Sequence, residues 1–339
     1  MINPLPIRLG LNPTRARVST PLTAAEFVGQ LISAQRHRDP ADDAAALLRR
    51  FSAGEVRLDS GEILRPDSPL SPGVFVNFYR YPAPEREVPG QLRLLFSDAT
   101  LLVLDKPPFL ATLPRGQHIR ETALVRARIQ FNVPELSPCH RLDRLTSGVL
   151  MMTKRPEARG AYQTMFDRRL PQKTYEAVTE LPDNVAFSPI PRFRDWRSWD
   201  APTAQAPWEL RHHMIKIRGR LATYLDESMP VEDMNARTLV TGMRVENRQG
   251  RDVAVWTLLP KSGRTHQLRV AMRTLGLPIL NDPLYEELSD TALFTPDGVL
   301  PSPVFAEHED FTRPMGLIAK RLEFTDPLTE EPRSFSSLY

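Results

Sequence analysis

The sequence contains almost no cysteine. Its one cysteine, Cys139, has no partner for a disulfide within the chain, which fits a reducing compartment and predicts a cytoplasmic protein. No stretch approaches the roughly 18 consecutive apolar residues that a membrane-spanning helix needs. Residues 1–20 hold three arginines and no acid, and they lack the apolar core of a signal peptide. We expect a basic N-terminal arm there, with a transit peptide as the weaker alternative.

Motifs for cofactors and metals are also missing. The chain has neither the phosphate-binding loop G-x-x-x-x-G-K-[ST] nor the dinucleotide motif G-x-G-x-x-G. Its seven histidines are scattered, and the adjacent pair His212 and His213 has no second ligand pair at a spacing suited to zinc. We therefore expect neither a cofactor nor a metal ion.

The net charge is only +3, but the cations are unevenly placed. Residues 211–220 hold four cations and two histidines without an acid. Such a run is usually a solvated face, and contact with nucleic acid is the alternative. Residues 183–235 contain three of the four tryptophans. We interpret this stretch as an ordered excursion packed over the core, with a surface that stacks RNA bases as the alternative.

The first ninety residues predict a small unit with two helices and a hairpin. Thr23 and Glu26 have the spacing of a capping box before an apolar stripe. A second helix is expected to run from an N-cap at Asp39, with Pro40 in its first turn, to about Gly54. Short strands are expected at 56–58, near Ile63 and at 74–78, and the proline-rich residues 81–90 are expected to form a linker.

Beyond this linker, helices and strands alternate irregularly. Apolar runs and two-residue alternation predict strands at 101–108, 148–154, 172–180 and 252–260. Helical spacing predicts one helix over 156–170 and another that begins near Thr265. The irregular connections between these elements favour an α+β fold over a doubly wound sheet.

One carboxylate lies between two arginines in SPCHRLDRLTSGVL, residues 137–150. Arg141 and Arg144 would lower the pKa of Asp143, because nearby positive charge favours the ionised form. If Asp143 is catalytic, it then acts as a nucleophile or an electrostatic stabiliser rather than as a proton donor. A turn cap or a structural ion pair is the alternative. The neighbouring Cys139 is expected to be a packed thiol.

The segment HRLDRLTSG, residues 140–148, resembles the signature H-R-L-D-x-x-T-S-G of the RluA-type pseudouridine synthases at every fixed position. LLVLDKPPFLATLPRG (101–116), QKTYEAV (172–178) and SGRTHQLRVAMRTLGLPILNDPLY (262–285) resemble other motifs of that family, in the same order. Two positions depart from the pattern: Ala271 stands where the family has histidine, and Asn281 where it has glycine. The hairpin GEVRLDSG resembles, more weakly, part of an S4-type RNA-binding domain.

The resemblance implies a fold. A pseudouridine synthase domain with a mixed, mainly antiparallel central sheet and flanking helices and loops would occupy 91–339, with 183–235 as an excursion. A small S4-like α/β domain would occupy 21–80, behind the arm at 1–20 and before the linker at 81–90. The fold class is therefore expected to be α+β.

The resemblance also implies roles for single residues. Asp143 would be the nucleophile, Arg269 the arginine that reaches it, and Tyr175 the residue that stacks on or hydrogen-bonds the flipped base. Arg141 would face the RNA and help to displace the target base. The other implied substrate-binding residues are Leu268, His140, Arg264 and Thr146. Without the resemblance, Tyr175 would be interpreted as a core side chain, and Leu268 would fit the core of a helix nearly as well.

These features predict an enzyme that isomerises uridine to pseudouridine in structured RNA. Ribosomal RNA is favoured over transfer RNA, and the protein is expected to act as a monomer without an obligatory protein partner. One alternative is a non-catalytic RNA-binding or ribosome-assembly protein that has kept the fold. Another is an aspartate-dependent glycosidase, which needs a second carboxylate about 5–10 Å away as the acid. Asp105 or Asp282 could nominally serve as that acid, but neither has a reason to be neutral, so this alternative ranks last.

Overall fold

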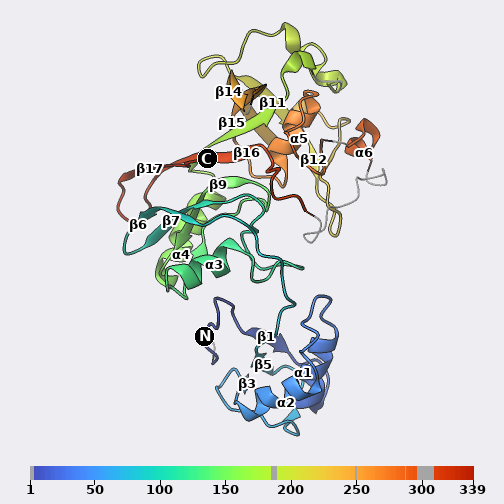
Figure 1. Ribbon diagram of the computed structural model, residues 1–339, viewed down its shortest axis with the longest axis vertical. Coiled ribbons are helices and arrows are strands. Elements are labelled where there is room, and N and C mark those ends of the chain that lie inside the picture. Colours follow the sequence, from blue (N-terminus) through green and yellow to red (C-terminus); the bar gives the residue numbers. More distant parts are fainter. Residues whose placement is uncertain (1–3, 185–188, 249, 287, 296–308) are drawn as a thin grey trace. The chain divides into compact units, whose positions relative to one another are not determined.

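The computed structural model describes residues 4–184, 189–248, 250–286, 288–295 and 309–339, which fall into two units (Figure 1). The N-terminal unit comprises Met1–Glu87 and Ala111–Leu136, and the C-terminal unit comprises Val88–Leu110 and Ser137–Tyr339. Residues 111–136, which include helix α3 (Ala123–Gln130), therefore group with the N-terminal residues. The sequence-based division had placed them in the domain over 91–339.

Hydrogen bonds between distant residues join the two segments of the N-terminal unit. The carboxylate of Glu85 accepts the backbone N–H groups of Ile119 and Arg120. Arg128 donates to the carbonyl of Gly10 over 2.9 Å. Because these partners lie far apart in sequence, local patterning gave no sign that 111–136 would group with the N-terminal residues.

The fold of residues 14–78 is a small sheet packed against two helices. Strands β1 (Thr14–Arg17), β5 (Phe75–Phe78) and β3 (Val56–Leu58) form an antiparallel sheet in the order β1-β5-β3. A second ladder joins β2 (Leu22–Thr23) to β4 (Pro69–Leu70). Helices α1 (Ala24–Ser33) and α2 (Ala44–Ser52) complete the fold. The apolar core is made by Val18, Ala24, Phe27, Val28, Ile32, Phe51, Val56, Leu64, Leu70, Val76 and Phe78.

Two expectations for this unit are corrected. The predicted basic arm over 1–20 contains the strand β1. Its side chains alternate as in a half-buried strand: Arg15 projects outward to pair with Asp59, and Ala16 packs on the core. The N-cap of α2 is Asp43, whose carboxylate accepts the N–H of Ala46, and not Asp39. The Asp39 carboxylate instead caps a separate turn by accepting the N–H of Ala41.

Other local expectations for this unit are confirmed. The capping box of α1 is formed, since the Thr23 and Glu26 side chains each accept a backbone N–H of the other residue. Gly54, just beyond α2, has a φ of +66°, as a residue that ends a helix often does. The expected strand near Ile63 is reduced to one bridge, to Arg57.

The C-terminal unit is built on one ten-stranded sheet. Its main order is β11-β14-β15-β10-β16-β9-β7-β6, with β17 paired to β16 and β8 to β9. Among the described strands of this sheet, only β9 and β16 run parallel. The strands are β6 (Arg93–Ser97), β7 (Leu101–Lys106), β8 (Ser137–Pro138), β9 (Ser147–Thr153), β10 (Gln172–Thr179), β11 (Trp208–His212), β14 (Ala236–Arg248), β15 (Arg251–Pro260), β16 (Leu317–Thr325) and β17 (Pro332–Ser336).

Helices and short ladders flank this sheet. The helices are α4 (Pro156–Asp167), α5 (Gln267–Thr274) and α6 (Asp290–Phe294), and a two-stranded ladder joins β12 (Met214–Ile215) to β13 (Tyr224–Leu225). Single 3₁₀ turns lie at Pro182–Asn184, Pro191–Phe193, Trp196–Ser198 and Val231–Asp233. The mixed, mainly antiparallel sheet with helices confirms the expected α+β class.

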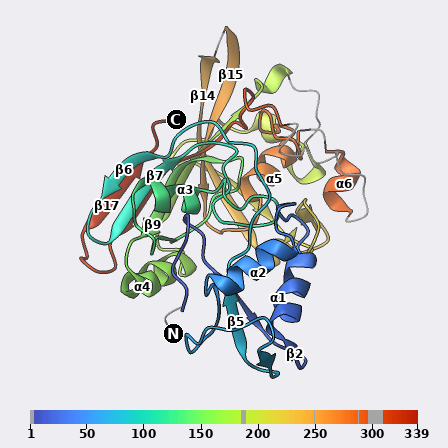
Figure 2. The same cartoon turned by 60° about the horizontal axis from the view of Figure 1, so that its bottom comes forward.

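The predicted strands of this unit are confirmed, while its helix ends differ. The helix expected over 156–170 ends at Asp167, and Leu170 is exposed. The helix expected from Thr265 begins at Gln267, because His266 before it has a left-handed backbone with a φ of +59°. Figure 2 shows β14 and β15 extending together beyond the other strands. The two strands stay paired along this extension, from Arg244 opposite Val255 to Arg248 opposite Arg251.

Two tryptophans of the excursion over 183–235, Trp196 and Trp208, pack on the sheet, while Trp199 is exposed. Trp196 is buried, and its ring and that of Trp208 lie 6.2 and 5.8 Å from the ring of Trp256 on β15. This arrangement supports the interpretation of an excursion that packs on the core, and it speaks against a surface that stacks RNA bases. In the basic run at 211–220, His212 is likewise buried, so the run is not a uniformly solvated face.

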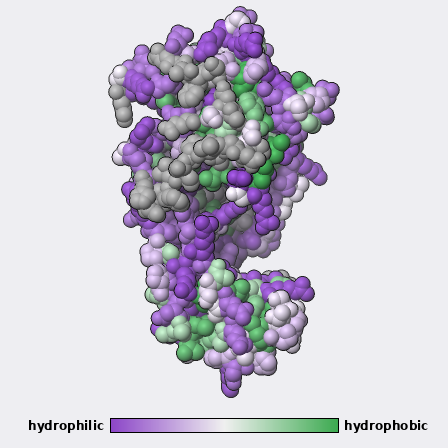
Figure 3. Space-filling model, turned by 90° about the vertical axis from the view of Figure 1, so that its right-hand side faces the viewer, coloured by the Kyte–Doolittle hydropathy of each residue, from purple (hydrophilic) through white to green (hydrophobic). Residues whose placement is uncertain are grey.

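The surface of the N-terminal unit mixes hydrophobic and hydrophilic residues on the face that Figure 3 shows. Its exposed apolar side chains include Leu9, Leu48 and Ile63. Within the described part of the chain, every helix is too short or too polar to span a membrane.

Gly148 is the glycine whose replacement we expect to cost most stability. Its φ is +112°, and an added Cβ would lie 2.3 Å from the carbonyl oxygen of Ala319 on β16. Gly148→Ala is therefore expected to lower the free energy of unfolding by about 3–5 kcal/mol, measured by urea denaturation. Gly160→Ala in α4 is the control, because a Cβ there meets nothing within 4 Å. That variant is expected to gain about 0.5–1 kcal/mol, and equal effects of the two substitutions would contradict this account.

Candidate active site

Asp143 lies in the loop that joins β8 to β9. The backbone N–H of Thr146 closes a turn onto the Asp143 carbonyl, over 3.1 Å. The fully buried Lys106 ammonium, at the end of β7, donates to the carbonyls of Pro107, Leu110 and Arg144, at 2.9, 2.7 and 3.1 Å. One lysine thus ties the Asp143 loop to the loop after β7 and fixes where the carboxylate stands.

Strand β16 aligns the Asp143 loop with Tyr175. Ala319 of β16 pairs with Gly148 at the start of β9 on one side and with Tyr175 of β10 on the other. Two strand spacings therefore separate Gly148 from Tyr175, about 10 Å. The register of β10 shifts between Thr174 and Tyr175, and such irregularities re-aim a side chain next to a functional site.

Arg269, the first-turn arginine of α5, reaches Asp143 from another part of the chain. Its Nη1 lies 4.0 Å from Oδ2 of Asp143. The rest of the guanidinium binds Asp282 in a bidentate pair, with Nε–Oδ2 at 2.7 Å and Nη2–Oδ1 at 2.6 Å. Arg269 is 5% exposed and Asp282 is fully buried. Asp282 thus holds the arginine in one orientation, with its remaining nitrogen towards Asp143.

Further contacts hold Asp282 and Arg269 in place. Asp282 accepts the N–H groups of Leu284 and Tyr285 at 3.0 and 3.1 Å. The Arg269 guanidinium lies 5.0 Å from the centre of the Tyr285 ring. The Tyr285 hydroxyl is in turn 2.9 Å from Nδ1 of His266 and accepts the N–H of Thr223 over 2.8 Å. This network comes from four separate stretches of the chain and preorganises the cation beside Asp143.

The charge state of Asp143 is set by opposing effects. Burial raises the pKa of the Asp143 carboxyl, and Arg269 and then Arg141 oppose this rise, while the nearby Asp282 adds to it. The net direction is upward, although 35% of the side chain remains exposed. The carboxylate can therefore be reached by a substrate, and Arg269 is its main source of electrostatic support.

The expectation that Arg144 supports Asp143 is corrected. The Arg144 guanidinium points to Glu309, with Nη1–Oε2 at 2.6 Å and Nη2–Oε1 at 2.7 Å. Adjacent residues in a turn direct their side chains differently. Arg144 therefore binds another residue although it follows Asp143 in sequence. The cation that lowers the pKa of Asp143 most is Arg269, 126 residues further along the chain.

Tyr175 lies close enough to Asp143 for the charge of the carboxylate to affect the pKa of the phenol. Burial raises the pKa of the Tyr175 phenol, and the charge of Asp143 raises it further. The phenol is therefore un-ionised at neutral pH and can donate a hydrogen bond. The structure thus brings together Asp143, Tyr175 and Arg269, the three residues that the sequence had assigned to catalysis.

The remaining expected site residues divide into exposed and buried ones. Arg141 and Arg264 are exposed, and Nε of Arg264 donates to the carbonyl of Asn235 over 3.2 Å. Leu268 and Thr146 are buried, with 6% and 2% of their surface exposed. Nε2 of His140 accepts the N–H of Met151. Burial lowers the pKa of His140 to about 3, so its ring is neutral.

Cys139 is packed, as the sequence predicted. The side chain is 7% exposed, and burial raises the pKa of its thiol to about 12. It therefore stays a thiol at neutral pH and is unsuited to act as a nucleophile.

The family model of the RNA pseudouridylate synthases matches residues 100–274. This chain belongs to that family. Family membership makes it a pseudouridine synthase, an isomerase whose substrate is RNA, and confirms the resemblance that HRLDRLTSG had indicated. The match runs through the Asp143 loop, Tyr175 and Arg269.

The chain is also similar to several named proteins. The chain is 31% identical over 293 residues to the ribosomal large subunit pseudouridine synthase D of Xanthomonas campestris pv. campestris, covering 83% of this chain and 77% of that protein. It is 27% identical to the dual-specificity RNA pseudouridine synthase RluA of Haemophilus influenzae, covering 73% and 92%. A solved structure, human RNA pseudouridylate synthase domain containing 1, is 20% identical with a TM-score of 0.49 and covers 74% of this chain and 86% of that one.

Three residues of the site were not assigned to it from the sequence. Asp282 was considered only as a possible acid, and Lys106 and Tyr285 were quoted within motifs without a role. The signals were the family segments LDKPP and NDPLY, which hold all three residues. Their contacts with Arg269 and with the loop that carries Asp143 depend on the fold, so the motifs could mark these residues but could not show which of them meet.

The departure at Asn281 has a structural explanation. Asn281 has a φ of +58°, in the left-handed region where the family's glycine is favoured and asparagine is tolerated. Its side chain donates to the carbonyl of Pro314 over 3.0 Å and accepts from Arg313 over 2.9 Å. The turn that carries Asp282 is thus kept. Ala271 is fully buried in α5, and nothing in the structure explains why alanine replaces histidine there.

Proposed function

We propose that this enzyme converts a specific uridine of a structured RNA to pseudouridine, with Asp143 as the nucleophile. The observation that carries the proposal is a reachable carboxylate 4.0 Å from a buried arginine whose other nitrogens are bound to Asp282. A carboxylate held beside a fixed cation stays available in its ionised form, which a nucleophile requires.

The reaction exchanges one bond to the sugar for another. The bond between C1′ and N1 of the uracil breaks and a bond between C1′ and C5 forms, while C5 loses a proton to solvent and N1 gains one. Asp143 would assist either by attacking C1′ or by adding to the base. Every heavy atom is conserved and no electrons are transferred, so we propose no cofactor.

Other residues of the site would hold the substrate. Tyr175, as an un-ionised phenol, would stack on the detached base or donate a hydrogen bond to it. Arg141 would occupy the place that the flipped base leaves in the RNA. Leu268 would form an apolar wall, and Arg264 would bind phosphate. For His140 and Thr146 we propose support of the Asp143 loop, because both are largely enclosed by protein.

Ribosomal RNA is the proposed substrate. The relative that is 31% identical is described as acting on the ribosomal large subunit, and the weak net charge fits either RNA class. We further propose that the N-terminal unit holds the RNA, as an S4-like domain would, and that the enzyme acts as a monomer in the cytoplasm.

Neither of the two candidate acids for the glycosidase alternative is free. Both oxygens of Asp282 are bound to Arg269. The Asp105 carboxylate accepts the Ser337 hydroxyl and the Leu338 N–H, each over 2.7 Å. Neither carboxyl is thus placed to protonate a leaving group.

The test is tritium release from ribosomal and transfer RNA transcripts that carry [5-³H]uridine. The C5 hydrogen is lost only if the base is reattached through C5, so release to one equivalent per RNA molecule establishes site-specific isomerisation. Release from the ribosomal transcript alone supports the proposed substrate. Release from the transfer RNA alone contradicts it, and release from neither contradicts the proposed function.

The rate of tritium release is expected to fall as the pH falls through a pKa above the ordinary aspartate value of about 3.9. Asp143 must be ionised to react, and its pKa is raised in the folded enzyme, so it becomes protonated at a higher pH than an exposed aspartate. Single-turnover rates between pH 4 and 8, with RNA binding measured in parallel, check this. A rate that stays constant down to pH 4 would exclude it.

A further inference from the structure

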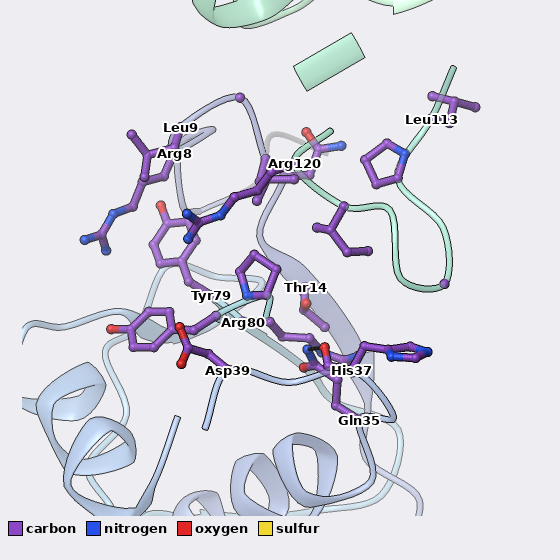
Figure 4. A pocket seen from close by; sticks show the side chains of 18 of the residues that line it. Arg8, Leu9, Thr14, Gln35, His37, Asp39, Tyr79, Arg80, Leu113 and Arg120 are labelled. Atoms are coloured by element: carbon purple, nitrogen blue, oxygen red, sulfur yellow. Dashed lines mark hydrogen bonds between the residues drawn. The ribbon is translucent and has the colours of Figure 1, made fainter. Parts of the chain in front are cut away.

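The N-terminal unit contains a cavity that the reaction described above does not use. It has a volume of about 990 Å³, within the usual size of ligand pockets. Its walls come from the start of the chain, from the segments around Gln35 and Tyr79, and from residues 113–128 of the same unit (Figure 4). Both segments that make up this unit therefore line the cavity.

The cavity is lined by five arginines and one carboxylate. The arginines are Arg8, Arg36, Arg80, Arg120 and Arg128, and the carboxylate is that of Asp39. Arg8 is paired with Glu55 at 2.6 Å, and Arg128 donates to backbone carbonyls. Among the described residues, the guanidinium groups of the other three make no hydrogen bond or ion pair. The cavity thus has a surplus of positive charge.

Two buried polar atoms in its wall have no hydrogen-bond partner in the described structure. They are Nε of Arg80, a donor, and Oε1 of Gln35, an acceptor. Burial also lowers the pKa of Arg80. Both atoms are enclosed by protein and do not open onto the cavity. A ligand can therefore reach Arg80 only through the terminal nitrogens of its guanidinium group.

The wall that carries Arg80 is rigidly held. The fully buried Arg50 guanidinium pairs with Asp42 at 2.7 Å, and its Nε donates to the carbonyl of Tyr79 over 2.7 Å. It also lies 3.9 Å from the centre of the Tyr81 ring. Arg80 stands between these two tyrosines in the chain, so its backbone position is fixed before a ligand arrives.

We propose that this cavity binds an unpaired nucleotide of the RNA substrate. Arg80, with Arg36 and Arg120, binds the phosphate. A concave pocket suits a nucleotide splayed out of a loop rather than a duplex. The choice of RNA over an acidic peptide rests on the proposed function.

The test compares Arg80→Gln with Arg65→Gln, an exposed arginine of the same unit outside the cavity. With full-length enzyme and a ribosomal RNA transcript carrying [5-³H]uridine, Arg80→Gln is expected to raise KM about tenfold, as the loss of a charge-assisted contact does, and to leave kcat unchanged. The salt dependence of RNA binding, measured by fluorescence anisotropy, is expected to weaken by about 0.7 per lost phosphate contact.

Thermal unfolding without RNA shows whether a loss of binding is a loss of structure. Removing an unpaired buried cation is expected to leave the midpoint of Arg80→Gln equal to that of wild type or above it. A lowered midpoint together with weaker binding, or a KM equal to that of Arg65→Gln, overturns the proposal. So does polyglutamate that competes with RNA for wild-type enzyme but not for Arg80→Gln, because it assigns the cavity to an acidic peptide.

The same binding data separate this proposal from the proposed function. If wild-type enzyme releases no tritium while Arg80→Gln still weakens RNA binding, the isomerase assignment fails and the nucleotide pocket stands. If tritium release proceeds with equal KM in both variants, the pocket fails and the isomerase stands.

Discussion

Asp143→Asn is expected to abolish tritium release, lowering the single-turnover rate by at least about 10³-fold. Asparagine keeps the shape of the side chain and removes the negative charge that a nucleophile needs. RNA binding is expected to change less than twofold, because phosphate contacts supply most of the affinity. The measurement is the rate of release at saturating enzyme, with anisotropy for binding.

The stability of this variant separates a catalytic from a structural role. Since burial disfavours the charged form of Asp143, Asp143→Asn is expected to leave the free energy of unfolding unchanged or to raise it. Asp67→Asn, at an exposed carboxylate of the N-terminal unit, is the control and is expected to keep the full rate. A rate for Asp143→Asn within tenfold of wild type would show that Asp143 is not the nucleophile and would favour the binding-protein alternative for this site.

Arg269→Met is expected to lower both stability and activity. The substitution leaves the fully buried Asp282 without its partner, which is expected to cost about 3–5 kcal/mol of unfolding free energy. It also removes the cation that most opposes the rise in the pKa of Asp143. The acid side of the pH–rate profile is therefore expected to move to higher pH, since Asp143 takes up a proton more readily. Urea denaturation and tritium release between pH 5 and 9 measure the two effects.

The double variant Arg269→Met with Asp282→Leu shows which effect belongs to which partner. Removing both charges is expected to recover most of the lost stability, because neither is left buried alone. Activity is not expected to return, because Asp143 still lacks its cation. Recovery of the rate together with stability would show that Arg269 serves the fold and not the carboxylate. Arg264→Met, at an exposed arginine ahead of the same helix, is the control, with an expected loss of stability below about 0.5 kcal/mol.

Much of the local structure could be predicted from the sequence, because it depends on contacts between near neighbours. The capping box at Thr23 and the buried strand at 101–106 follow from spacing alone. Where two local signals compete, this reasoning failed. Asp39 and Asp43 both precede the helix, and nothing in the local pattern marks the second as its N-cap. The strand at 14–17 was missed because its pairing partner, β5, lies sixty residues away.

In the candidate site too, some features could be predicted from the sequence and others could not. Three family motifs singled out Asp143, Tyr175 and Arg269 as candidates, because a family pattern records what the fold brings together. Adjacency in sequence suggested the wrong second cation, since Arg144 turns to Glu309. Neither the role of Asp282 in holding Arg269 nor that of Lys106 in holding the loop was visible before the strands were paired.

The sequence by itself determined the class of fold and the family, and it singled out Asp143 as the proposed reacting carboxylate, because periodicity and motif are properties of the chain. Only the tertiary structure decided the charge environment of Asp143, the bidentate hold on Arg269 and the gathering of Arg36, Arg80 and Arg120 around one cavity. These depend on burial and on distances of a few ångströms between residues far apart in the chain. Such distances are set by the packing of the whole unit and leave no local pattern in the sequence.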